Sequence, residues 1–198
     1  MQSIVLASQS PRRKQLMEWA EIPFQVICQF TDESFPADMP VEEVPVHVAR
    51  EKARVTREHI REAYHGRHAD QPVLAADTIV VLDNEVINKP ADLEEAVMML
   101  QKLSGRSHRV ITGVVILYGD REISFADITE VEFHPLTEAQ IRFYVEKYEP
   151  LDKAGAYAIQ EWIGVVGIKS IRGDFYNVMG LPVSRVIQSL QQLWAAQG

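Results

Sequence analysis

The sequence predicts an α/β fold with a mixed β-sheet and flanking helices. Short apolar runs typical of strands alternate with longer segments of helical character along the chain. The run over residues 73–82, apolar except for Asp77 and Thr78, is typical of a buried strand. Two further apolar segments, 108–118 and 122–133, are joined by Gly119-Asp120, which is a hairpin signal and adds antiparallel pairing.

The first third of the chain combines an apolar strand pattern with a clear helix start. Ser10 suits an N-cap and Pro11 suits the first helical position, where a missing N–H costs nothing. The expected elements are, in order, a strand over 4–7, a helix over 11–20, a strand over 24–30, a polar loop over 31–40, a helix from Pro45 to about residue 63, and a polar loop over 64–72. This last loop is the best internal hinge or insertion point.

Caps and turns place the helices of the remaining chain. Asp92 stands three residues before Glu95, which resembles a capping box, and Thr137 suits a further N-cap. Ser104-Gly105 is typical of a helix end. The expected elements are strands over 73–82, 86–87, 108–118, 122–133 and 163–171, and helices over 92–103, 137–148 and 182–195.

Length and composition place the chain among ordinary globular proteins. Its 198 residues fit one domain or one bilobed unit, and they suffice for a core without disulfides or metals. The 20 Lys and Arg residues against 28 Asp and Glu residues give a net charge of −8, which disfavours a general nucleic-acid-coating role. We therefore expect no nucleic-acid partner.

Cysteine content and hydropathy indicate the compartment. Cys28 is the single cysteine, so no intrachain disulfide can form, which favours a reducing compartment. Within its apolar run, Cys28 is expected to be buried and inert. No apolar stretch approaches the ~20 residues of a membrane span, and no signal peptide is visible at the N-terminus. We therefore expect a cytoplasmic protein without membrane contact.

The first candidate for chemistry is Ser8-Gln9-Ser10-Pro11-Arg12-Arg13, which joins a strand to a helix N-terminus. Such a junction offers free backbone N–H groups and the positive end of the helix dipole, which suit a phosphate. Two hydroxyls and two guanidinium groups add donors that match phosphate oxygens. A capped helix with solvated arginines explains the segment equally well, and the segment is not a P-loop because it lacks GK[ST].

Asp77 interrupts the apolar run over 73–82. A carboxylate in a buried strand is costly to desolvate unless it is paired or binds a metal, so a functional role is favoured over a loop cap. Lys52 on the long helix and Lys89 before Pro90 are each more typical of surface lysines when taken alone. Together with Arg13, they would supply point charges suited to a polyphosphate.

Two later segments offer pocket-like features. The small residues Ala154-Gly155-Ala156 permit close backbone approach, and Gln160 carries both a donor and an acceptor, although tight packing explains the segment equally well. The turn-rich stretch 173–182 could shape a pocket wall. No GxSxG or GxGxxG is present, so serine-hydrolase and Rossmann interpretations have no support. A zinc site has weak support, because no HExxH and no cysteine accompanies the clustered histidines His59, His65 and His68.

Taken in order along the chain, these motifs resemble the Maf family. The matching motifs are Ser8 to Arg13, Glu51-Lys52-Ala53, Ala76-Asp77-Thr78 with Lys89-Pro90, Leu103-Ser104-Gly105 through Thr112-Gly113-Val114, and Asp152 to Gln160, with 173–182 similar to the last family motif. The resemblance covers nearly the whole chain. It implies an elongated Maf/ITPase-like fold, a single domain over 1–198 with two lobes around a cleft, nucleoside triphosphate pyrophosphatase activity, and a homodimer.

The resemblance also implies roles for individual residues. Asp77 is expected to accept the proton, and Glu33 together with Asp77 is expected to hold a divalent Mg²⁺ or Mn²⁺. Water would attack the α-phosphorus, and pyrophosphate would leave with its charge held by metal and lysine. Four residues are expected to bind the triphosphate: Ser8, Arg13, Lys52 and Lys89.

Three positions bear on the base. The subgroup that prefers dTTP and UTP resembles this chain at Arg12, Thr78 and Gln160, whereas a sister subgroup that acts on 7-methyl-GTP has a bulky aromatic residue at the first position and an acidic residue at the third. A uracil or thymine edge offers C=O and N–H, which one amide answers at once. We therefore expect dTTP, UTP and modified pyrimidine nucleotides as substrates. Asp174 departs from the family's usual serine, and we expect it to face away from the triphosphate or lie at the rim.

Other functions remain open from the sequence. A non-catalytic, nucleotide-binding regulator of septum formation fits the family's association with septum inhibition, but pure binding gains nothing from a buried carboxylate at Asp77. A 7-methyl-GTP pyrophosphatase is disfavoured by Arg12 and Gln160, and a plain structural domain leaves the ordered motifs unexplained. Replacing Asp77 by Asn distinguishes catalyst from regulator, because a catalyst loses turnover but keeps its ligand.

Overall fold

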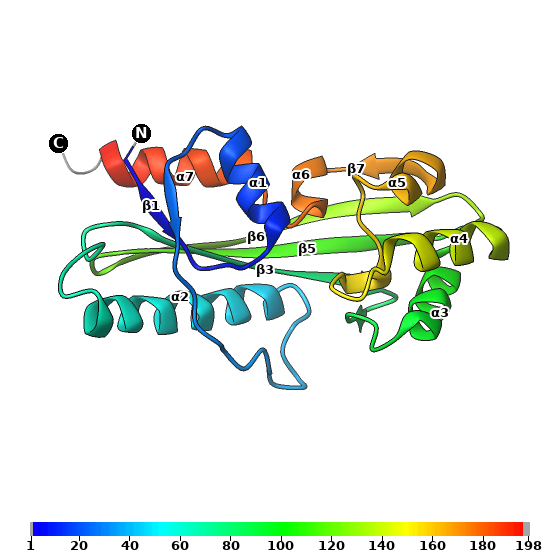
Figure 1. The fold of residues 1–198 in the computed structure, drawn as a ribbon, viewed down its shortest axis with the longest axis horizontal. Coiled ribbons are helices and arrows are strands. Elements are labelled where there is room, and N and C mark those ends of the chain that lie inside the picture. Colours follow the sequence, from blue (N-terminus) through cyan, green and yellow to red (C-terminus); the bar gives the residue numbers. More distant parts are fainter. Residues whose placement is uncertain (1, 196–198) are drawn as a thin grey trace. The chain divides into compact units, whose positions relative to one another are not determined.

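The computed structural model describes residues 2–195 and has a mixed α/β fold (Figure 1). Within these residues the sheet has seven strands: β1 Ile4–Leu6, β2 Phe24–Val26, β3 Val73–Leu82, β4 Glu85–Ile87, β5 Ser107–Tyr118, β6 Arg121–Phe133 and β7 Ile168–Arg172. The helices are α1 Pro11–Trp19, α2 Val44–Ala63, α3 Leu93–Leu103, α4 Glu138–Tyr148, α5 Trp162–Gly167, α6 Phe175–Val178 and α7 Val183–Ala195, with a 3₁₀ turn, η1, at Ala154–Ala156. No helix in this described part is both long and apolar enough to cross a membrane.

The sheet is mixed, which confirms the fold class predicted from the sequence. Its strands are hydrogen-bonded in the order β2-β1-β3-β5-β6-β7, and β4 pairs with β3. β1 runs parallel to both β2 and β3, whereas β4 is antiparallel to β3 and β7 is antiparallel to β6. Parallel neighbours need crossover connections, which α1 and α2 supply. The turn after β1 therefore leads directly into the N-terminus of α1.

The chain divides into two compact units, each built from separate stretches of sequence. Unit 1 comprises the described residues of 1–77, 112–127 and 180–198, and unit 2 comprises 78–111 and 128–179. The long strands β3, β5 and β6 contribute residues to both units. The loop 64–72, predicted as the best internal hinge or insertion point, lies wholly inside unit 1, so the division between the units does not fall there. Polar composition marks a loop but not a boundary, which here falls within strands.

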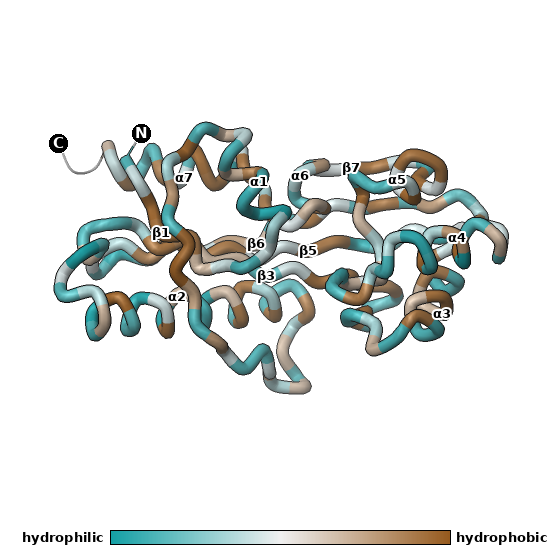
Figure 2. The backbone as a smooth tube through the Cα atoms, in the orientation of Figure 1, coloured by the Kyte–Doolittle hydropathy of each residue, from teal (hydrophilic) through white to brown (hydrophobic). Residues whose placement is uncertain are grey.

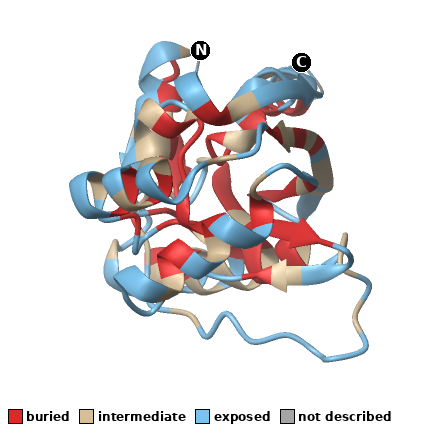
Figure 3. Cartoon of the chain, turned by 90° about the vertical axis from the view of Figure 1, so that its right-hand side faces the viewer, coloured by how far each residue is buried: buried red, intermediate tan, exposed pale blue. Residues whose placement is uncertain are grey.

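Unit 1 is held together by apolar strand residues packed against α2. The tube in Figure 2 alternates between hydrophobic and hydrophilic along α2, and Figure 3 shows buried residues on both strands and helices. A Cβ on Gly113 of β5 would stand 2.2 Å from the backbone of Pro45, so only glycine permits this close approach of α2. The core cluster takes residues from strands and from α2, among them Val5, Ala75, Val115, Ala49 and Ala53.

Unit 2 has an aromatic core that contains a buried histidine. The rings of His108, Phe133 and Tyr157 lie with centroids 5.1 to 5.5 Å apart. The Nε2 atom of His108 is 2.7 Å from the hydroxyl of Tyr157. Burial lowers the pKa of His108 to about 4 and raises the pKa of Tyr157, because a charged ring is poorly solvated there. Both side chains are therefore neutral near pH 7.

The predicted helix caps are confirmed. The side chains of Ser10, Asp92 and Thr137 each accept a hydrogen bond from the backbone N–H three residues later, at 3.5, 2.8 and 3.3 Å. Thr137 forms a full capping box with Gln140. Such caps satisfy backbone donors that the first turn of a helix leaves unpaired, and they fix where α1, α3 and α4 begin.

The predicted strand over 24–30 is shorter in the structure. β2 ends at Val26 because its partner β1 ends at Leu6, and the last bond joins the Ile27 N–H to the Leu6 carbonyl at 3.3 Å. Phe30 is consequently 94% exposed, and Cys28 is partly exposed rather than buried as predicted. Apolar residues without a neighbouring strand to pair with do not extend the sheet.

The predicted strand over 163–171 was wrong in its first half. α5 occupies Trp162–Gly167, and only Ile168–Arg172 forms β7. Short apolar runs do not by themselves distinguish a helix from a strand. Val165 is 83% exposed, so the apolar run that suggested a buried strand is partly an exposed helix face.

Candidate active site

The junction between β1 and α1 holds a buried arginine. Arg13 donates from Nε to the carbonyl oxygen of Gly180 at 2.7 Å and from Nη1 to Oγ of Ser8 at 3.3 Å. Both Arg13 and Ser8 are buried, at 9% and 7% exposure. Burial lowers the pKa of Arg13, while the negative charges of Asp77 and Glu33 oppose that shift. A guanidinium stays protonated in proteins, so the junction presents a fixed positive charge.

A lysine lies between two carboxylates in the same unit. The Nζ atom of Lys52, on α2, is 2.8 Å from Oδ1 of Asp77 on β3 and 2.7 Å from Oε1 of Glu33 in the loop after β2. The side chains of Lys52 and Asp77 are only 16% and 15% exposed, whereas that of Glu33 is 51% exposed. The sequence analysis named all three residues but did not predict this contact.

The two carboxylates converge on one ammonium, so they form a small set of hard oxygen ligands. Among the described residues, no group of three or more His, Cys, Asp or Glu side chains could hold a metal. Mg²⁺ is commonly bound by one or two carboxylates together with substrate phosphates and water. Glu33 and Asp77 therefore fit a divalent ion that arrives with a phosphate ligand, and they do not form a closed protein cage.

Unit 2 contains three further predicted residues, Thr78, Lys89 and Gln160. Lys89 follows β4 and is exposed, and Thr78 is half-buried on β3. The preceding Asn88 accepts a hydrogen bond through its carbonyl from the Gly155 N–H at 3.1 Å. Gly155 has φ 69°, and a Cβ there would lie 3.0 Å from the Val80 side chain. Glycine therefore allows the 154–160 segment to lie against β3 beside the turn that carries Lys89.

Gln160 lies at an exposed position in the turn between η1 and α5. The residues before it, from Gly155 to Ile159, are buried, so the glutamine is the exposed polar group of an otherwise packed segment. Its side chain offers one acceptor and two donors. Arg12, the other position with a predicted influence on the base, is half-buried on α1 in unit 1.

Two residues with structural roles near the site were missed or left open by the sequence. Gly180 acts through its backbone carbonyl, which no side-chain pattern reveals, although the 173–182 motif contains it. The carboxylate of Asp174 accepts a hydrogen bond from the Tyr176 N–H at 2.8 Å and caps α6. The negative charge that departs from the family pattern is thus engaged by a helix start in unit 2.

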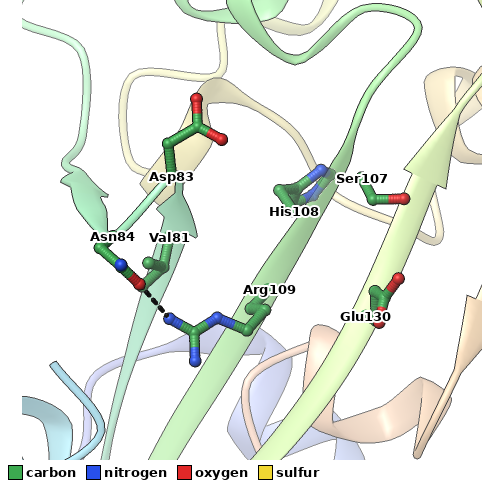
Figure 4. Close-up of a pocket in the computed structure, with 7 residues that line it drawn as sticks. All are labelled: Val81, Asp83, Asn84, Ser107, His108, Arg109 and Glu130. Atoms are coloured by element: carbon green, nitrogen blue, oxygen red, sulfur yellow. Dashed lines mark hydrogen bonds between the residues drawn. The ribbon is translucent and has the colours of Figure 1, made fainter.

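A separate pocket of about 260 Å³ lies on the strands of unit 2 (Figure 4). Arg109 donates to Oδ1 of Asn84 across it at 3.1 Å. None of the predicted site residues lines this pocket, so it is not the site that the motifs indicate. It is lined by Val81, Asp83, Asn84, Ser107, His108, Arg109 and Glu130.

Comparison with known proteins identifies the family. The family model described as Maf-like protein matches residues 3–193. The chain is 50% identical to a dTTP/UTP pyrophosphatase of Cytophaga hutchinsonii over 96% of this chain and 84% of the relative. It is 47% identical to one of Bacteroides thetaiotaomicron and 44% identical to one of Halalkalibacterium halodurans, over 96% of this chain in each case and over 95% and 96% of the relatives.

A solved structure titled "The structure of the Staphylococcus aureus Ham1 protein" covers 67% of this chain and 72% of its own, with 13% identity and a TM-score of 0.45, which is too low to add to the description above. The family model alone spans nearly all the described residues, including every predicted site residue. By this match and by its relatives, the chain belongs to the Maf family.

Proposed function

We propose that this protein is a nucleoside triphosphate pyrophosphatase that hydrolyses dTTP and UTP, and modified pyrimidine nucleotides of the same kind. The relatives that carry the name dTTP/UTP pyrophosphatase, at 43 to 50% identity over nearly the whole chain, support the activity. The single structural observation that supports it best is Lys52 between Asp77 and Glu33. The cytoplasm and a homodimer are proposed from the family resemblance.

In the proposed reaction, water attacks the α-phosphorus and the bond between that phosphorus and the bridging oxygen to the β-phosphorus breaks. The products are the nucleoside monophosphate and pyrophosphate. Asp77 accepts a proton from the attacking water through its carboxylate. Arg13, Lys52 and Lys89 hold the triphosphate, and Ser8 adds a hydroxyl donor.

A divalent ion would be held by Glu33 and Asp77, where it would neutralise phosphate charge and polarise the reacting phosphoryl group. Lys52 bonds both of these carboxylates in the structure. We infer that its ammonium moves to the phosphate oxygens when nucleotide and ion arrive, since the carboxylates then have another cation to face.

The proposed base recognition uses Gln160, with Thr78 and Arg12. An amide presents a donor and an acceptor side by side, which matches the adjacent N–H and C=O of a uracil or thymine edge. A site built on paired hydrogen bonds discriminates strongly against bases that leave one partner unsatisfied. Both Thr78 and Gln160 belong to unit 2, apart from the charged residues of unit 1.

The test is pyrophosphate release from dTTP, UTP, dCTP, GTP and 7-methyl-GTP, with Mg²⁺ and then Mn²⁺, for the wild type and Asp77→Asn. Turnover of dTTP and UTP that disappears in the variant supports the proposal. Turnover of 7-methyl-GTP alone would keep the pyrophosphatase activity and overturn the assignment of the base. Tight nucleotide binding without any turnover would favour the non-catalytic regulator instead.

A further inference from the structure

The turn that carries Gln160 is hydrogen-bonded to one buried hydroxyl, that of Tyr144. The backbone N–H of Glu161 donates to the carbonyl of Ala158 at 3.1 Å, which closes the turn around Ile159 and Gln160. Tyr144 on α4, fully buried, accepts a hydrogen bond through its hydroxyl from the Ala158 N–H at 3.2 Å. The same hydroxyl donates to Oε2 of Glu161. One phenol therefore bonds a residue on each side of Gln160.

The Glu161 carboxylate is itself fixed on its other oxygen. Oε1 of Glu161 lies 3.6 Å from Nζ of Lys153, and that ammonium also lies 2.7 Å from Asp152. The Lys153 side chain is only 10% exposed, so this ion pair is shielded from solvent. Charge-assisted contacts of this kind are stronger and more directional than neutral ones when partly buried.

A second constraint comes from close backbone packing. A Cβ on Gly164 of α5 would stand 1.7 Å from the carbonyl oxygen of Ile159, a distance that no side chain tolerates. α5 therefore approaches the turn as closely as glycine allows. The turn has a bonded contact before Gln160, a bonded contact after it, and a packed helix against its middle.

We propose that Tyr144 is a positioning residue for base recognition, which acts by fixing the turn that presents Gln160. This proposal rests on the proposed function, in which Gln160 reads the pyrimidine edge. Tyr144 is buried beneath the turn, so we expect it to touch no substrate and to act on the turn through Ala158 and Glu161. Hydrogen bonds weaken steeply with misalignment, so a loosened turn is expected to lose the paired contact with the base.

The chain offers a clean variant and a matched control. Tyr144→Phe keeps the ring and its stacking on Tyr148, with ring centroids 5.0 Å apart, but it leaves the Ala158 N–H without its acceptor. Tyr148→Phe removes the same group from the neighbouring ring of α4, whose hydroxyl makes no hydrogen bond to the turn among the described residues. Because α5 and η1 remain, the first variant is expected to fold, and circular dichroism checks this for both.

The measurement is steady-state hydrolysis of dTTP and UTP by the wild type, Tyr144→Phe, Gln160→Ala and the double variant. We expect Tyr144→Phe to raise KM about tenfold and to leave kcat within about twofold, the scale of one or two lost hydrogen bonds. In the Gln160→Ala background, the same change is expected to add almost nothing, because Tyr144 acts through Gln160. Tyr148→Phe is expected to match the wild type.

Additive effects of the two substitutions would overturn the inference, since Tyr144 would then act independently of Gln160. An unchanged KM in a folded Tyr144→Phe protein would also overturn it.

If Tyr144→Phe does not fold, Glu161→Ala and Glu161→Gln test the same contact from its other partner. Glu161→Ala is expected to raise KM for dTTP. Glu161→Gln keeps an acceptor for the Tyr144 hydroxyl, so its KM is expected to stay near the wild-type value. Equal KM values for the two variants would overturn the inference. A wild type that hydrolyses neither nucleotide overturns the proposed function and this inference together.

Discussion

The two units of this protein carry different kinds of chemistry. Unit 1 holds a charged cluster in which Lys52 bonds both Glu33 and Asp77. Unit 2 carries one charged candidate, Lys89, and the neutral amide Gln160, which stands on a turn whose position Tyr144 fixes. A charged cluster contributes electrostatic stabilisation and proton transfer, whereas a neutral amide contributes hydrogen bonds that depend on its exact position. Substitutions in unit 1 are therefore expected to lower kcat, and those around the turn to raise KM.

Asp77→Asn is expected to have the largest effect. An amide of the same shape cannot accept the proton of the attacking water, so kcat for dTTP should fall by about 10³, within the range for a lost general base. KM should change little, because Lys52 and Arg13 still hold phosphate. Rates of pyrophosphate release at saturating and limiting dTTP give both constants. An increase of KM at constant kcat would assign Asp77 to substrate binding instead of catalysis, and would contradict the difference expected between the two units.

Lys52→Gln is expected to lower kcat by about 10², since one phosphate-binding charge is lost. Without nucleotide, the same variant should bind Mn²⁺ more tightly than the wild type, because the ammonium no longer competes for Glu33 and Asp77. Titration of free Mn²⁺ by electron paramagnetic resonance measures this directly. Lys14→Gln, on the exposed side of α1, is the control and should leave Mn²⁺ binding unchanged.

Unit 2 is expected to respond to acid through His108. Its pKa is lowered to about 4 in the folded protein and is near 6.5 in an unfolded chain, so the unfolded state binds more protons between these values. The free energy of unfolding should therefore fall as pH drops from about 6.5 to about 4, by at most about 3 kcal/mol. Urea unfolding across this range should show the loss in the wild type and a flatter profile in His108→Gln. Equal slopes would assign the acid response to other groups.

Gly164→Ala is expected to have the smallest effect on turnover and a clear effect on the turn. The added Cβ must displace the Ile159 carbonyl, which should cost about 2 kcal/mol of stability and raise KM for dTTP at nearly constant kcat. Thermal unfolding and steady-state kinetics measure the two effects. Val165→Ala, an exposed neighbour in the same helix, should change neither. A fall in kcat at unchanged KM would contradict the expectation that changes around the turn affect KM.

Much of the fold followed from the sequence because local signals agreed. The strand over 73–82 is confirmed to the residue, and Asp77 stood out as a carboxylate within it. The caps of α1, α3 and α4 were readable because each needs a particular side chain. The strands over 24–30 and 163–171 were not, since a strand depends on a partner that lies elsewhere in the chain.

The sequence predicted which residues belong to the candidate site but not the contacts between them. The contact between Lys52 and Glu33 depends on the path of a loop without regular structure, which no local pattern fixes. Tyr144 was missed because an aromatic residue on the inner face of a helix is ordinarily core, and only its hydroxyl has a special task. Gly180 was missed because it acts through its carbonyl. Residues that act through a backbone atom, or by positioning another residue, produce no recognisable sequence pattern.

The hydrogen bond from Arg13 to Gly180 has a consequence for the order of synthesis. It joins positions 167 residues apart, and unit 1 takes strands and helices from both early and late parts of the chain. A ribosome releases residue 13 long before residue 180, so the buried guanidinium has no Gly180 carbonyl to bond until that residue has been made. Contacts of such long separation are slow to close. The contacts of Lys52 with Glu33 and Asp77 need only the first 77 residues, so the carboxylate cluster can form before Arg13 gains its last partner.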